Sequence, residues 1–209
     1  MLYRFLALFF IGSLVFSQDL DWTNSSFEDG KIGWTVYPDE WNWSSVETYS
    51  FSGSKSIKMD PYPDEFNSLR KEFINQDAQD LVGQSFILKA QLFSSSDDNL
   101  WQGNAIARLQ AVYLNENWQE IRIDKGESFD SNNSSLDTWT SRELITTVPE
   151  NTNYISFGVS VFGESNSGSV YIDDFTANYA PPYEGPDWYV NTSGSDDNDG
   201  SELLPFLSI

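Results

Sequence analysis

The chain has 209 residues, no Cys and no His, and its 11 Lys and Arg against 32 Asp and Glu give a formal net charge of −21. This charge repels phosphate backbones and excludes nucleic acid as a favoured partner. Without His or Cys there is no Ser-His-Asp triad, no Cys-His dyad, no disulfide and no zinc site of the common kind, so any metal has to lie on oxygen ligands. Aromatic residues make up 16% of the chain, more than core packing alone needs.

Residues 1–17 have the pattern of a secretory signal peptide. Arg4 supplies the positive start, the apolar run Phe5–Phe16 follows, and Ser17 precedes a predicted cleavage before Gln18. A membrane anchor is the alternative, but the run is shorter than the ~20 apolar residues that a spanning helix needs. We therefore expect a secreted or cell-surface protein with no membrane insertion after cleavage. Secretion without Cys suggests a bacterial product.

Beyond the signal, apolar residues recur with the two-residue period of β-strands. Strands are predicted at 33–37, 43–48, 56–59, 69–73, 86–92, 107–113, 138–146, 155–161 and around 170–172. Clusters of Gly, Asn, Asp, Ser and Pro separate them, and only 65–80 has an alternative interpretation as a helix. Strands with one apolar and one polar face predict an all-β protein built as an antiparallel sandwich of two sheets.

The strand pattern stops at Tyr179. Residues 180–187 contain three prolines and predict a stiff linker, and only residues 188–209 follow it. We therefore expect residues 18–179 to form the sandwich module and residues 188–209 to be the truncated start of a second domain.

Three parts of the chain carry motifs of one known group of proteins. They are Asn24–Gly30 followed by Gly33–Trp34, then Ser50–Lys58, and then Trp139 with Val148–Pro149 and Gly168–Phe175. In this order they resemble the jelly-roll carbohydrate-binding modules attached to xylanases and cellulases, which belong to the galactose-binding-like superfamily. The resemblance covers about residues 19–179 and implies an antiparallel jelly-roll β-sandwich. Because some members of this superfamily bind no sugar, the fold is better supported than the ligand.

The tail carries a second resemblance. Residues 188–191 (Trp-Tyr-Val-Asn), the polar run 194–201 and Pro205–Phe206 resemble the start of right-handed parallel β-helix domains of the pectin-lyase-like kind. The resemblance implies a short C-terminal stub of a parallel β-helix, whose further coils lie outside this sequence. An EF-hand interpretation of residues 195–200 fails because the twelfth loop position is Phe206 instead of Glu, so a polar turn is expected.

The first resemblance also implies a structural calcium ion. In those modules calcium joins the first strand to the last, and its ligands correspond here to Glu28, Asp173 and the backbone of residues 50–54. Oxygen ligands from distant segments suit Ca²⁺. The alternatives are that Glu28 and Asp173 are solvated rim acids, or that Asp174 replaces Asp173 if the strand parity shifts by one residue.

A sugar site needs flat aromatic faces beside planar hydrogen-bonding groups. The predicted ligand-binding residues are Trp41, Trp43, Trp101, Arg108 and Gln110. The three tryptophans lie in or next to polar stretches, and Arg108 and Gln110 lie on the wet face of a central strand. Core or edge packing remains the alternative for each tryptophan.

Other residues are weaker candidates for ligand binding or are assigned to packing. Lys89 and Gln91 are expected on a strand next to that of Arg108 and Gln110, where they would extend the floor of the cleft. Trp118, at an expected hairpin tip, and Tyr62 are weaker choices for the aromatic wall. Trp34 and Trp139 are assigned to packing because both lie within the motifs of the fold.

The sequence predicts no enzyme in this segment. A jelly-roll glucanase would carry Glu-x-Asp-x-x-Glu and a jelly-roll alginate lyase Arg-x-Glu-x-Arg with a Gln-x-His, and the chain has none of these. We expect a secreted, non-catalytic carbohydrate-binding module that targets an attached polysaccharide-active or surface β-helix domain to polysaccharide. The negative charge favours a neutral β-glycan. The alternative is a calcium-stapled structural or adhesion sandwich of a cell-surface protein without a sugar site. The sequence carries no signal for the oligomeric state.

Overall fold

The computed structural model of the chain describes residues 23–37, 43–63, 68–164, 167–180, 188–198, 200 and 202–207. The predicted signal peptide, residues 181–187 of the predicted linker and Trp41 lie outside the described residues. No helix in the described part of the chain has the length and apolarity to cross a membrane.

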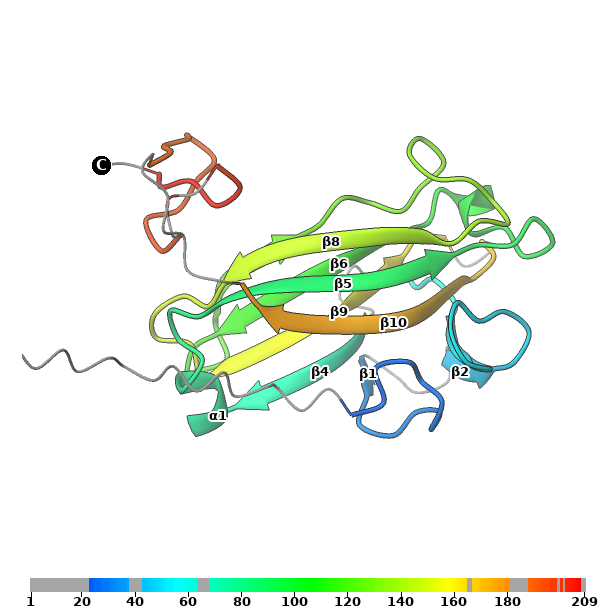
Figure 1. The fold of residues 1–209 in the computed structure, drawn as a ribbon, viewed down its shortest axis with the longest axis horizontal. Helices are drawn as coiled ribbons and strands as arrows, with labels where there is room; N and C mark the ends of the chain where they lie inside the picture. The colour runs from blue at the N-terminus through cyan, green and yellow to red at the C-terminus, as the bar shows by residue number, and fades with distance from the viewer. Residues whose placement is uncertain are drawn as a thin grey trace, which may run out of the picture.

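Two five-stranded antiparallel sheets pack face to face (Figure 1). The strands are β1 (Thr35–Tyr37), β2 (Trp43–Val46), β3 (Ser56–Met59), β4 (Ser68–Ile74), β5 (Ser85–Phe93), β6 (Ile106–Leu114), β7 (Glu120–Lys125), β8 (Thr140–Thr147), β9 (Tyr154–Phe162) and β10 (Val170–Tyr179). Sheet A has the order β1-β4-β9-β6-β7 and sheet B the order β2-β3-β10-β5-β8. Two short helices, α1 (Gln76–Gln79) and the 3-10 helix η2 (Leu100–Gly103), lie between strands. The predicted all-β antiparallel sandwich is confirmed.

The core lies between the sheets because each strand turns alternate side chains inward. On β6, Ala107, Leu109, Ala111 and Tyr113 are fully buried, and the residues between them face outward. The central strand β9 differs on its outer face, where Ser156, Gly158 and Ser160 replace large side chains. The outer face of sheet A is therefore recessed along its middle strand, β9, where the side chains are small.

The helix alternative for residues 65–80 is wrong. Residues Ser68–Ile74 form β4, which pairs with β9 at all seven positions, while α1 is only four residues long. Leu69 is fully buried in the core, so tertiary burial on a period of two decides the structure of this segment.

Two further differences from the sequence prediction concern single strands. The strand β7 was not predicted, because the segment Glu120–Lys125 is rich in charged residues, yet it pairs with β6. Lys89 and Gln91 lie on β5, which belongs to sheet B, so the expectation that they neighbour Arg108 and Gln110 on β6 is wrong.

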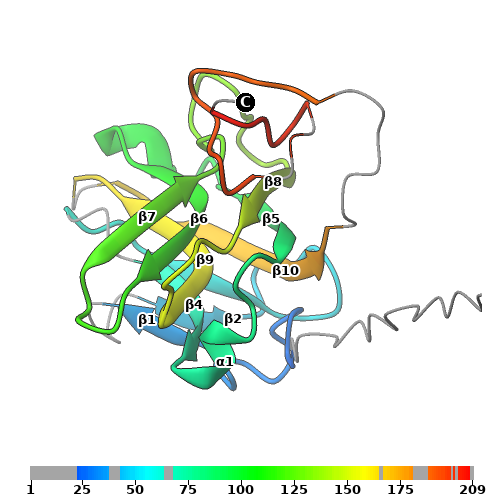
Figure 2. The same cartoon turned by 90° about the vertical axis from the view of Figure 1, so that its left-hand side faces the viewer.

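Residues 188–198, 200 and 202–207 form a small structure of their own above β7 and β8 (Figure 2). Val190 forms a parallel bridge with Phe206, and the Trp188 ring stacks on the Phe206 ring with centroids 5.8 Å apart. Asn191 donates its N–H to the Phe206 carbonyl at 2.8 Å. The beginning of a parallel β-helix in this segment stays a prediction.

Candidate functional site

The outer face of sheet A carries a groove of about 360 Å³, which we call the sheet-A groove. It crosses the sheet from β1 to β7, since its lining comes from all five strands and the β6–β7 hairpin. The lining residues are the aromatic Tyr37, Trp118 and Tyr154, the polar Arg70, Gln110 and Glu120, and the apolar Val112, Leu114 and Ile123.

The groove exists because one row of the sheet lacks a side chain in its middle. Arg70, Gly158, Gln110 and Lys125 are consecutive partners in the register of β4, β9, β6 and β7. A Cβ on Gly158 would meet the Leu69 carbonyl oxygen and the Arg70 backbone, so only glycine allows the two strands to approach this closely. Gln110 is only 4% exposed and lies in the floor.

An ion pair and a hydrogen bond, both to Glu72, fix the polar wall of the groove. The Arg70 Nε lies 2.7 Å from Glu72 Oε1, and the Tyr154 hydroxyl donates to the same oxygen at 2.6 Å. Burial and the bond to Glu72 both raise the pKa of the Tyr154 phenol, so it remains a neutral donor at ordinary pH. The Arg70 guanidinium also lies 4.7 Å from the Tyr37 ring centroid. These contacts hold the Arg70 plane in one orientation.

The opposite end of the groove presents an exposed aromatic ring. Trp118 lies in the β6–β7 hairpin and is 63% exposed, yet its ring contacts Tyr154 with centroids 5.2 Å apart. Asn115 shapes this turn, because its Oδ1 accepts the N–H groups of Asn117 and Gln119. The groove therefore offers exposed aromatic surface at both ends, Tyr37 and Trp118, with amide and guanidinium groups between them.

Of the predicted ligand-binding residues, the structure brings only Gln110 into this groove. Arg108 lies two residues along β6 on the same face, opposite Ser160, with its guanidinium 4.8 Å from the Phe162 ring centroid. It does not line the groove. Trp41 lies outside the described residues.

The other two predicted tryptophans lie elsewhere. Trp43 is on β2 of sheet B, 8% exposed, with Lys31 Nζ 4.1 Å from its ring centroid. Trp101 is in η2 and packs on Phe129 at 5.7 Å. Neither lines the sheet-A groove, and a role for either in ligand binding stays a prediction.

The packing assignments fit the structure. Trp34 is buried between Phe27 at 5.0 Å and Phe175 at 5.2 Å. Trp139 packs against Phe93 at 5.2 Å.

Arg70, Glu120 and Tyr154 were not among the predicted site residues. Their strands were visible only in part from the hydrophobic pattern, and it is the pairing order β4-β9-β6-β7 that brings them to one groove. The order in which strands pair depends on long-range contacts, and the hydrophobic period along the sequence does not predict it. Trp118 did carry a signal, an aromatic residue in a polar hairpin tip.

The two predicted calcium ligands both hold the segment of residues 51–55. Asp173 Oδ2 accepts the N–H groups of Phe51 at 2.7 Å and Ser52 at 3.1 Å, and its Oδ1 accepts the N–H of Asp174. Asp173 is fully buried, and this burial raises the pKa of its carboxyl group, which the N–H donors oppose.

Glu28 binds the other half of that segment. Its Oε1 accepts the N–H groups of Ser54 and Lys55, both at 2.9 Å, and its Oε2 accepts the Ser54 hydroxyl at 2.8 Å. All four carboxylate oxygens of Glu28 and Asp173 thus face donors, an arrangement that does not fit a cation as it stands. Across the described ranges, no cluster of three or more acidic side chains converges on one point. Calcium here stays a prediction that requires these donors to turn away.

The fold is similar to that of solved carbohydrate-binding modules. The C-terminal family 22 module of Clostridium thermocellum Xyn10B matches with a TM-score of 0.57 and 12% identity, over 77% of this chain and 93% of that one. The CBM22-1 xylan-binding domain of Paenibacillus barcinonensis Xyn10C matches with a TM-score of 0.52 and 12% identity, over 74% and 90%. A family 16 carbohydrate-binding module matches with a TM-score of 0.50 and 16% identity, over 74% and 96%.

No protein-family model matches the sequence, and no curated protein matches it. The similarity therefore lies in the fold: the chain has the jelly-roll β-sandwich of these carbohydrate-binding modules, as the sequence motifs predicted.

Proposed function

We propose that the protein is a non-catalytic carbohydrate-binding module that holds a neutral β-glycan in the sheet-A groove. The observation that carries this proposal is the groove itself, in which Tyr37 and Trp118 flank the planar groups of Arg70 and Gln110. Sugar rings present C–H faces that pack on aromatic rings, and their hydroxyls pair with amide and guanidinium groups. Two of the similar folds support it: one is a xylan-binding domain, and the other has a cleft that takes part in ligand binding.

Electrostatics favour a neutral ligand. The groove contains one arginine, which is already paired with Glu72, and one carboxylate in its lining, Glu120. The whole chain carries a net charge of −21, which disfavours approach of an anionic polymer. A lining with a single carboxylate also differs from the paired carboxylates that glycoside hydrolysis uses. The groove is therefore suited to binding, with xylan as the first glycan to test.

The biological setting is part of the proposal. The signal-like residues 1–17 favour secretion, and the Pro-rich residues 180–187 favour a spacer to an attached domain. A module of this kind binds weakly at each site and acts by keeping its attached domain close to an insoluble polymer.

A structural or adhesion sandwich is the second candidate. The observation that favours it is the double attachment of residues 51–55 by Glu28 near one chain end and Asp173 near the other, which stabilises the sandwich without any sugar. A structural module of this kind needs no ligand in the groove.

Affinity electrophoresis of the full chain in gels containing xylan, mannan, β-glucan or polygalacturonate separates the two candidates. Retardation by a neutral glycan that Trp118→Ala reduces supports the binding module. Absence of retardation in all four gels would contradict the proposal and leave the structural sandwich.

A further inference from the structure

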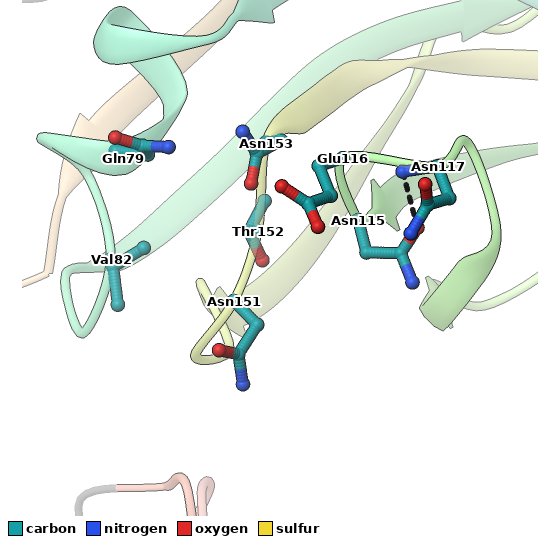
Figure 3. Close-up of a pocket in the computed structure, with 8 residues that line it drawn as sticks. All are labelled: Gln79, Val82, Asn115, Glu116, Asn117, Asn151, Thr152 and Asn153. Carbon is teal, nitrogen blue, oxygen red and sulfur yellow. Dashed lines mark hydrogen bonds between the residues drawn. The ribbon is translucent and has the colours of Figure 1, made fainter.

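A second hollow, of about 470 Å³, lies at the end of the sandwich (Figure 3). It is next to the sheet-A groove, since neighbouring residues of β6 and β9 line the two sites. We call it the amide hollow, because its walls are Gln79, Asn115, Asn117, Asn151 and Asn153 together with Glu116. These residues come from α1, the β6–β7 hairpin and the β8–β9 loop. The volume is within the range of small-molecule sites in proteins.

The backbone of the hollow is held in place before any ligand binds. The Asn153 N–H donates to the Leu114 carbonyl at 2.9 Å, and the Asn153 carbonyl accepts the N–H of Asn75 at 2.8 Å. The Thr152 hydroxyl, which is fully buried, donates to the Pro149 carbonyl at 2.7 Å. A ligand would therefore not have to order these loops, which lowers the cost of binding.

The side chains are left available. Among the described residues, no partner takes up the carboxamides of Gln79, Asn117, Asn151 and Asn153, whereas the Asn115 side chain is used within its own turn. Figure 3 shows the Gln79 amide pointing across the hollow toward Asn153 and Glu116. Each carboxamide offers both donors and an acceptor, the combination that matches hydroxyl groups on neighbouring carbons.

The composition of the hollow selects the ligand class. Glu116 is the only ionisable group among its lining residues, so no cation is present to bind a carboxylate or phosphate. Val82 is the only large apolar side chain, and no aromatic ring offers a stacking face. A neutral, hydroxyl-rich group held by hydrogen bonds fits these walls. Such bonds alone are weak, so the group needs a second anchor.

The sheet-A groove supplies that second anchor, because residues adjacent in the sequence line the groove and the hollow. Leu114 lines the groove and Asn115 the hollow, and in the same way Tyr154 lines the groove and Asn153 the hollow. Consecutive Cα atoms are about 3.8 Å apart, so the boundary between the two sites is narrow along both β6 and β9. The groove crosses the strands, while the hollow lies at their ends. The hollow therefore lies beside a glycan chain bound in the groove, and does not extend the groove along that chain.

We propose that the amide hollow binds a neutral single-sugar branch of the glycan whose main chain lies in the sheet-A groove. This inference rests on the proposed function, and it goes further by assigning the module a preference for branched over linear polymer. The groove provides the affinity for the main chain of the glycan, and the hollow provides the selectivity for branched over linear glycans.

Isothermal titration of the full chain with matched linear and branched glycans tests the inference. The probes are xylo-oligosaccharides with and without single arabinose branches, and manno-oligosaccharides with and without single galactose branches. The variant Gln79→Ala/Asn117→Ala removes two free carboxamides. It leaves the hairpin turn intact, because Asn117 contributes its main-chain N–H to that turn. Gln84→Ala, at an exposed glutamine outside the hollow, is the matched control.

The inference predicts that the wild type binds a branched probe more tightly than its linear partner. The double variant should lose about three- to tenfold in affinity for the branched probe and keep its affinity for the linear one. Gln84→Ala should behave as the wild type, and an unchanged melting temperature would show that the variants fold. Equal losses on linear and branched probes, or no loss on either, would overturn the inference while leaving the groove proposal standing. A wild type that binds neither linear nor branched probes would overturn the inference, and absence of binding to β-gluco-oligosaccharides as well would overturn the groove proposal.

Discussion

The exposed indole of Trp118 leans against the buried phenol ring of Tyr154, with centroids 5.2 Å apart and planes inclined at 48°. The Tyr154 hydroxyl in turn donates to Glu72, and Glu72 pairs with Arg70, whose guanidinium faces Tyr37. A continuous series of contacts thus joins the hairpin tip to the far edge of sheet A. The two exposed aromatic rings of the groove are positioned relative to each other by the buried Tyr154 and the half-buried Glu72 and Arg70.

Trp118→Ala should weaken binding of a neutral glycan by about fivefold, because stacking on an aromatic ring contributes about 1 kcal/mol. The free energy of unfolding should change by no more than about 0.5 kcal/mol, since the side chain is 63% exposed. Titration and urea unfolding measure the two effects. Trp188→Ala removes a 56% exposed indole outside the groove and should leave binding unchanged. Similar losses in both variants would argue against a local site.

Arg70→Lys should weaken glycan binding by about three- to tenfold while keeping the positive charge. Lysine can still pair with Glu72, but it lacks the planar fork that faces Tyr37 and reaches the groove floor. Arg108→Lys is the matched control, since Arg108 lies on the same face outside the groove. A loss confined to Arg108→Lys in titrations would favour the site predicted from sequence over the groove.

The hydrophobic period was sufficient to predict the sandwich, because alternation along β5, β6 and β9 specifies one buried face for each strand. It was not sufficient for the candidate site. Arg70 and Gln110 are 40 positions apart in the sequence and become neighbours only through Gly158, on a strand that lies between theirs in the sheet but after both in the chain. The aromatic-rich composition led to the prediction of tryptophans as ligand-binding residues, yet Trp43 is buried beneath Lys31.

Gly158→Ala should destabilise the protein by about 1–3 kcal/mol, because the added methyl group meets the Leu69 carbonyl and the Arg70 backbone. The β4–β9 pairing would have to open, and the groove would change shape with it. Urea unfolding measures the first effect and glycan titration the second. Ser156→Ala, on the same face of β9, is the control and should cost far less. A fully stable Gly158→Ala variant would show that the close strand approach is not required.

Glu28 should contribute stability that depends on pH. The N–H donors of Ser54 and Lys55 lower the pKa of its carboxyl group below the ordinary value of 4.5. Between the lowered pKa and 4.5 the unfolded chain binds the proton more readily, so this stabilisation is present above pH 4.5 and is lost as the pH falls through the lowered pKa. The melting temperature of Glu28→Gln should therefore lie below that of the wild type at neutral pH, and the difference should shrink in acid. A difference that stays constant with pH would contradict this role.

The same melting series tests calcium. If a cation binds between Glu28 and Asp173, calcium should raise the melting temperature of the wild type above its value in chelator and leave Glu28→Gln unaffected. Equal melting temperatures in calcium and chelator would show that the hydrogen bonds to residues 51–55 stabilise the chain ends without a metal.

The most direct test of the central claim is to map amide chemical-shift changes while a neutral xylo-oligosaccharide is added to the isotope-labelled protein. Binding in the sheet-A groove predicts the largest shifts at Arg70, Gln110, Gly158 and the hairpin around Trp118. Shifts centred on β2 and η2, around Trp43 and Trp101, would contradict the groove and place the ligand at the site predicted from sequence. The absence of any shift with xylan, mannan and β-glucan oligosaccharides would contradict sugar binding altogether.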